Sequence, residues 1–225
     1  MRFKIVLLFF AVVFLGVMSQ RGEASIFITE ILADPAGGTA GDANADGITS
    51  STQDEFFELL NLGLDPVDLS SWSMKDAVST RHVFPANTLL DPYNFLVVFG
   101  GGSPNLPGVD YQTASTGGLS LNNSGDTVSI FDNSGFLMDQ VIYGTLADHD
   151  QSLAKFPEGS ASGFVLHSSL PEAQGRVFSP GKTVGGQSTY AGQLPPVAAV
   201  PELPAAVLFG MGSVLMGIKR KLRAA

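Results

Sequence analysis

The sequence predicts an all-β fold, and three observations support this. Short apolar or alternating runs recur along residues 25–182, and Gly, Asn, Asp and Pro bound them. No long stretch of this region places apolar residues at the 3.6-residue spacing of an amphipathic helix. The chain has 26 Gly and 13 Pro but only 15% charged residues, which favours a turn-rich β protein. Many short strands at near-regular spacing indicate a sandwich or a barrel.

Seven runs are predicted to be strands. The cleanest alternation is in residues 127–132, where Val128 and Ile130 share one face and are expected to point inward. Residues 132–135 read Asp-Asn-Ser-Gly and predict a hairpin between this run and the next. The predicted strands are residues 25–32, 55–61, 72–74, 83–84, 94–99, 127–132 and 137–143.

Several single residues have predicted places in this fold. Trp72 is the only tryptophan of the chain and follows a turn, so it is expected to fill the core between sheets. The acids Glu55 and Glu58 are expected on a solvated strand face. The histidines are expected at the surface or at the edge of the core, and they are His82, His149 and His167.

Residues 1–24 are typical of a secretory signal peptide. Basic residues at positions 2 and 4 precede an apolar run at 5–18, and residues 22–24 read Gly-Glu-Ala, which favours cleavage by signal peptidase after Ala24. An uncleaved N-terminal anchor is the alternative. The apolar run is short for a membrane span, which needs roughly 20 residues.

The C-terminal end has three parts. Residues 183–199 are rich in Gly, Pro, Ala, Ser and Gln and predict a flexible linker. Residues 203–218 contain no charge and predict a hydrophobic helix within the last segment, 200–225. A basic end follows this helix, which favours insertion into a membrane with the basic end in the cytoplasm. The basic end consists of Lys219, Arg220, Lys221 and Arg223.

This order of motifs resembles the PEP-CTERM class of bacterial sorting signals, in its Val-Pro-x-Pro variant. The matching motif residues are Val200, Pro201, Glu202 and Pro204. Leu203 stands where the family usually has Pro, so Pro204 comes one residue late. In that family an exosortase-type transpeptidase recognises the motif and removes the tail. The resemblance therefore implies a protein exported to the surface or extracellular matrix of a Gram-negative-type bacterium. A plain C-terminal membrane anchor is the alternative.

The region between the two ends resembles the lamin-tail domain. The resemblance implies an immunoglobulin-like β-sandwich, here flanked by an N-terminal signal helix and a C-terminal hydrophobic helix, and an interaction module without chemistry of its own. Ser71 departs from the family pattern, because the family usually has Gly before the tryptophan. The matching segments are residues 27–32, 54–61, 67–76, 95–99, 118–128, 139–144, 151–153 and 179–181, together with Phe84 and Leu89.

A candidate calcium loop begins at residue 42. Residues 41–47 read Gly-Asp-Ala-Asn-Ala-Asp-Gly, which is similar to the first half of an EF-hand-type loop, and a hard cation needs several such oxygens. The twelfth loop position holds Gln53, so a loop one residue longer would close at the next residue. We expect Ca²⁺ to be structural here, and an ordinary polar surface loop is the alternative. The predicted ligands are Asp42, Asn44, Asp46, the carbonyl of Ile48, and Asp54.

Composition limits the function. Residues 25–200 hold five basic and nineteen acidic residues, a net charge of −14, which opposes nucleic-acid binding. The chain has no cysteine, and it lacks the G-x-S-x-G and H-E-x-x-H motifs. These absences argue against catalysis, and the two resemblances together imply a non-enzymatic module that binds envelope polysaccharide or protein. A calcium-dependent carbohydrate-binding module and a small secreted hydrolase or nuclease accessory are the alternatives.

Overall fold

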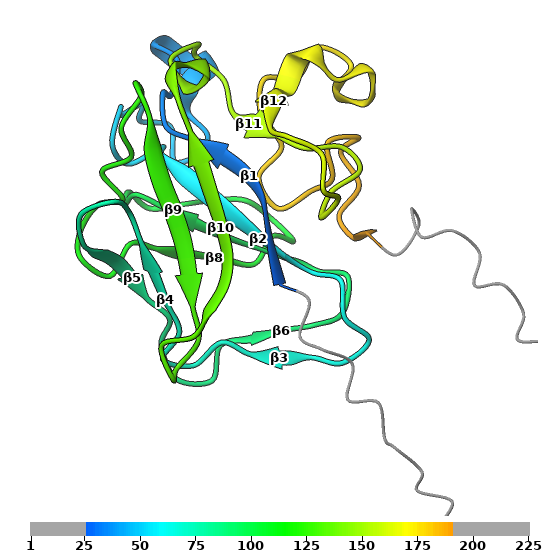
Figure 1. Ribbon diagram of the computed structural model, residues 1–225. Coiled ribbons are helices and arrows are strands. Elements are labelled where there is room, and N and C mark those ends of the chain that lie inside the picture. The colour runs from blue at the N-terminus through cyan, green and yellow to red at the C-terminus, as the bar shows by residue number, and fades with distance from the viewer. Residues whose placement is uncertain (1–25, 191–225) are drawn as a thin grey trace, which may run out of the picture. The chain divides into compact units, whose positions relative to one another are not determined.

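The computed structural model describes residues 26–190 (Figure 1). The predicted signal peptide, the sorting segment at 200–225, their two helices and the linker after residue 190 lie outside the described residues. Among residues 26–190, no helix has the length and apolar character needed to cross a membrane. Helical residues of this part are confined to four short 3₁₀ turns. These are η1 (Gly38–Gly41), η2 (Thr145–Ala147), η3 (His167–Ser169) and η4 (Pro171–Ala173).

Two β-sheets face each other and form a sandwich (Figure 1). The larger sheet has six strands in the order β12-β11-β1-β2-β7-β8, and only its β7–β8 pair is parallel. Its strands are β1 (Ile26–Leu32), β2 (Phe56–Asn61), β7 (Phe95–Phe99), β8 (Tyr111–Thr113), β11 (Leu153–Ala154) and β12 (Val165–Leu166).

The smaller sheet has four antiparallel strands in the order β10-β9-β4-β5. They are β4 (Ser73–Lys75), β5 (Thr80–Val83), β9 (Asp126–Phe131) and β10 (Leu137–Tyr143). A separate pair is formed by β3 (Val67–Asp68) and β6 (Leu89–Leu90). Each of the seven predicted strands overlaps an observed one, and the predicted hairpin joins β9 to β10. The sandwich architecture is confirmed.

The main core lies between the two sheets. Val128 and Ile130 of β9 are fully buried there, as their alternation predicts, because every second side chain of a strand points to the same face. Trp72 is also in this core and is only 6% exposed, which confirms its predicted place. A bulge in β1 between Ile28 and Glu30 shifts its register with β2.

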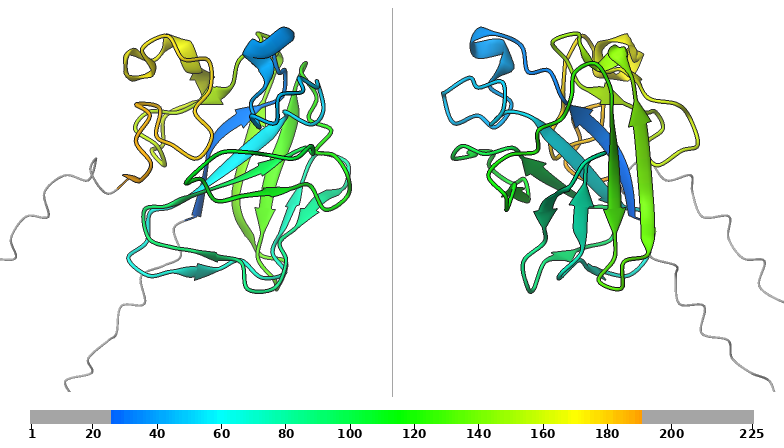
Figure 2. Two further views of the ribbon diagram at one scale, coloured as in Figure 1. Left: turned by 180° about the vertical axis from the view of Figure 1, so that it is seen from behind. Right: turned by 60° about the vertical axis from the view of Figure 1, so that its left-hand side comes forward.

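The outer face of the larger sheet is covered as well. All six residues of β2 and all five of β7 are buried, which requires cover on both faces. Residues 167–190, which we call the strap, supply part of this cover, and they run alongside β1 in the views of Figure 2. Val184 and Tyr190 of the strap are 2% and 7% exposed, so the packed domain continues beyond residue 182, where the sequence placed its end.

Candidate functional site

The predicted calcium loop, residues 42–54, connects η1 to β2 and is held by its own hydrogen bonds. The carboxylate of Asp42 accepts the amide hydrogens of Asp46 and Gly47, over 3.1 and 3.0 Å. The side-chain oxygen of Asn44 also accepts from the Asp46 amide, over 3.0 Å. Gly47 has a φ of +86°, a conformation that glycine adopts at little cost, so the predicted sharp turn is present.

Asp54 closes the loop at its strand end. Its carboxylate is fully buried and accepts the amide hydrogens of Asn44 and Ser50, over 3.0 and 2.7 Å. Burial raises the pKa of Asp54, and the negative charge of Asp42 adds to this increase. The first and last predicted ligands therefore lie close enough to interact electrostatically.

Asp46 joins the loop to the segment that follows β7. One carboxylate oxygen accepts the amide hydrogen of Ser103 over 2.9 Å, and the other accepts that of Ile48 over 2.8 Å. These two bonds lower the pKa of Asp46. A Cβ atom on Gly102 would lie 2.5 Å from side-chain atoms of both Asn44 and Asp46. Only glycine therefore lets the backbone at position 102 come this close to the loop.

The structure thus brings the predicted ligands into one loop, but it also ties their oxygens to backbone amides. In residues 26–190, no group of three or more His, Cys, Asp or Glu side chains is placed to hold a metal ion. Since Ca²⁺ takes six to eight oxygen ligands, a cation here would depend on the Asn44 side chain and the Ile48 carbonyl as well. The calcium site stays a prediction.

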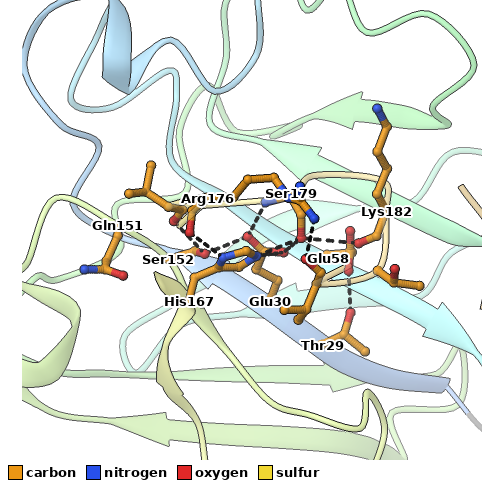
Figure 3. Close-up of polar contacts among 12 residues, drawn as sticks. Thr29, Glu30, Glu58, Gln151, Ser152, His167, Arg176, Ser179 and Lys182 are labelled. Atoms are coloured by element: carbon orange, nitrogen blue, oxygen red, sulfur yellow. Dashed lines mark hydrogen bonds and ion pairs between the residues drawn. The ribbon is translucent and has the colours of Figure 1, made fainter. Parts of the chain in front are cut away.

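A second cluster lies beneath the strap and was not identified from the sequence (Figure 3). It is centred on Glu30 of β1 and Glu58 of β2, which are 2% and 1% exposed. The carboxylate of Glu30 accepts from the Ser152 hydroxyl and the Ser179 amide, over 2.6 and 2.9 Å. Both acids lie on the outer face of the sheet, so the strap is what removes them from water.

Glu58 binds one group from the sheet and one from the strap. Its two oxygens accept from the Thr29 hydroxyl, over 2.6 Å, and from the Gly181 amide, over 2.7 Å. Burial raises the pKa of Glu58 well above its usual range, and the charge of Glu30 raises it further. Folding therefore makes Glu58 harder to ionise.

His167 completes the cluster. Its Nδ1 lies 2.9 Å from the carbonyl oxygen of Arg176, which only accepts, so this nitrogen is the donor. Its Nε2 lies 3.0 Å from Oγ of Ser179, which in turn lies 2.7 Å from Oε2 of Glu30. The hydroxyl of Ser179 therefore links the imidazole of His167 to the carboxyl group of Glu30.

The cluster is built for packing rather than for nucleophilic catalysis. In a Ser–His–acid triad the second imidazole nitrogen binds the acid, whereas here Nδ1 of His167 binds a backbone carbonyl. Ser179 is 4% exposed, and neither the groove of about 370 Å³ nor the one of about 140 Å³ is lined by it or by His167. The hydrogen bonds instead fasten the strap to the sheet.

The family model of the lamin tail domain matches residues 19–145. The chain belongs to the lamin tail domain family. No curated protein matches the chain at a significant level. The two facing sheets fit the immunoglobulin-like fold of this family, and the predicted resemblance is confirmed over residues 19–145. The resemblance predicted at residues 151–153 and 179–181 lies outside the matched region. The match ends after β10, so the strap and its attachment to Glu30 and Glu58 lie partly outside the matched region of this lamin tail domain.

Two expectations about polar residues of this lamin tail domain are wrong. Glu55 and Glu58 are not on a solvated face, because Glu58 lies under the strap and the Glu55 carboxylate accepts the amide hydrogen of Leu121. Burial raises the pKa of Glu55 to about 7. His82 and His167 are buried, at 2% and 0% exposure, rather than at the surface or core edge.

Proposed function

We propose that the chain is an exported, non-catalytic lamin tail domain that is held at the bacterial surface or in the exopolysaccharide matrix. There it binds an envelope polysaccharide or protein. Membership of the lamin tail domain family carries this proposal. The buried Ser179, His167, Glu30 and Glu58 also support it, because their hydrogen bonds attach the strap to the sheet.

Export is supported by the two ends of the sequence. The first 24 residues have the composition of a signal peptide, and the last 26 combine a Val-Pro-Glu motif, an apolar run and a basic end. Signal peptidase and an exosortase-type transpeptidase are the processing partners that these motifs favour. Before processing, the hydrophobic helix predicted at residues 203–218 would hold the chain in the membrane.

Mass spectrometry of the chain recovered from the cell surface tests this proposal. We expect a mature N-terminus at Ser25 and loss of the residues that follow about Glu202. If the surface protein keeps its C-terminal tail, the tail is a plain membrane anchor and not a sorting signal. Recovery of the unprocessed chain from the cytosol would overturn the proposed export.

A calcium-dependent carbohydrate-binding module is the second candidate. It is favoured by the geometry of the loop, in which the carboxylates of Asp42 and Asp54 both accept amide hydrogens from residues 44–50. A cation would neutralise their like charges. This candidate predicts glycan binding that is lost on chelation and in Asp46→Ala. Asp68→Ala is the matched control, because Asp68 also accepts the amide hydrogen of the residue two positions later. Glycan binding that survives both treatments would exclude it.

A further inference from the structure

The two sheets have unequal numbers of strands, and a groove lies where the larger one extends past the smaller one. The larger sheet ends in β11 and β12, whereas the smaller one ends at β10 (Figure 1). The groove has a volume of about 370 Å³. The edge of β10 at residues 140–144 forms one wall, and Leu153, Lys155 and Phe164 line the other side.

The wall formed by β10 is an unpaired strand edge. Within the described residues β10 pairs with β9 on one side and with no strand on the other. Its register with β9 is continuous from Asp139 to Tyr143, so alternate residues present their backbone N–H and C=O groups outward. The strand contains no Lys or Pro, the residues that usually shield an edge, and Ile142 is 74% exposed. At Asp139 the edge is occupied, because the Asp139 carboxylate accepts the amide hydrogen of Ile28 of β1 over 2.7 Å. The edge is therefore open to another strand at residues 140–143.

Lys155 gives the groove a charge. The residue is 9% exposed, and its Nζ lies 4.7 Å from the centre of the Phe164 ring. In residues 26–190, no Asp or Glu oxygen lies within 4.0 Å of that ammonium group. Lys155 lines the groove, so its unpaired positive charge makes the groove complementary to a negative group.

We propose that this groove binds an extended peptide segment that carries one carboxylate. The segment adds a fifth strand to the sheet beside β10, and its carboxylate pairs with Lys155. A peptide fits better than a sugar, because β10 offers backbone donors and acceptors at strand spacing. Lys155 also occupies the face of Phe164 on which a sugar ring would stack. The net charge of −14 repels strongly acidic partners, so the rest of the segment is uncharged.

This proposal goes beyond the proposed function, because it depends on neither export nor sorting. The first test titrates the full chain with the peptide Thr-Val-Thr-Val-Asp-Val-Thr, blocked at both ends, in a calorimeter. We expect binding that is at least about tenfold weaker when Asn replaces Asp, the scale of one charge-assisted hydrogen bond. Absence of binding at millimolar peptide would overturn the proposal.

Variants of the chain test whether Lys155 pairs with the carboxylate of the peptide. Lys155→Met keeps the unbranched side chain against Phe164 and removes the charge, so it is expected to abolish the preference for Asp over Asn. Lys182→Met is the matched control, because Lys182 is exposed and lies outside the groove. An unchanged preference in Lys155→Met would overturn the role of Lys155.

A change in the peptide tests strand pairing without altering the protein. Methylation of alternate backbone nitrogens removes the donors that would face β10, and we expect it to abolish binding. Equal binding of the methylated peptide would overturn strand addition. Binding of polygalacturonate that depends on Lys155, with no binding of the peptides, would assign the groove to an acidic glycan and would also overturn the proposal.

Discussion

Gly181 donates its amide hydrogen to Glu58 over 2.7 Å, although 123 positions separate the two residues. This bond joins the strap to the centre of the larger sheet and buries a carboxyl group that sequence alone places at a surface. A Cβ on Gly181 would lie 2.2 Å from the Val109 side chain, and its φ is +75°, so only glycine fits the position.

Glu58→Gln is expected to stabilise the domain at neutral pH. A carboxyl whose pKa is raised on folding favours the folded state below its unfolded pKa, about 4.3, and this contribution falls as pH rises towards the folded pKa. The free energy of unfolding of the wild type should therefore decrease from pH 5 to pH 8. Glu58→Gln should reduce that decrease in urea denaturation, by about 1.4 kcal/mol per unit of pKa elevation. Identical pH profiles would refute this account.

Ser179→Ala is expected to destabilise the domain by about 2–3 kcal/mol, because it leaves Nε2 of His167 and Oε2 of Glu30 buried without their shared partner. Urea denaturation measures the change. Ser134→Ala is the control, since Ser134 is exposed in the β9–β10 turn, and it should change stability by no more than about 0.5 kcal/mol. Equal effects of the two variants would contradict a structural role for the cluster.

A chain that ends at residue 145, where the family match ends, is expected to lose cooperative unfolding. It lacks β11, β12 and the strap, so it exposes Glu30, Glu58 and the outer face of β2 and β7. A chain that ends at Tyr190 should retain the full transition. Fluorescence of Trp72 during denaturation distinguishes the two, and a sharp transition in the shorter chain would show that the strap is dispensable.

Calcium is expected to raise the unfolding temperature if the loop binds it. A ligand at one hundred times its dissociation constant adds about 2.7 kcal/mol to the stability of the folded state. The increase in unfolding temperature should disappear in Asp42→Asn and persist in Asp68→Asn, which alters an exposed aspartate of β3. Calorimetric scans in calcium and in chelator measure it, and superimposable scans of the wild type would exclude the site.

The sequence predicts the longer strands well and the short ones poorly. Alternation in residues 127–132 and the turn at 132–135 place β9 and β10, since both signals are local. Strands β3, β6, β8, β11 and β12 have two or three residues, too few to display a period.

The buried cluster could not be predicted from spacing, because Glu30 and Ser179 lie 149 positions apart. One local signal was nevertheless present. Residues 56–61 read Phe-Phe-Glu-Leu-Leu-Asn and do not alternate, which is typical of a strand covered on both faces. An acid within such a run, here Glu58, is therefore expected to be buried and hydrogen-bonded.

The position of the strap at the end of the described chain has a mechanical consequence. Tyr190 donates its amide hydrogen to the carbonyl of Tyr93 over 2.9 Å. A pull transmitted through residue 191 therefore loads this bond first and the attachment of Gly181 to Glu58 later, before any strand of the sandwich. Such a chain would yield by peeling, one contact after another, while its sheets stayed intact.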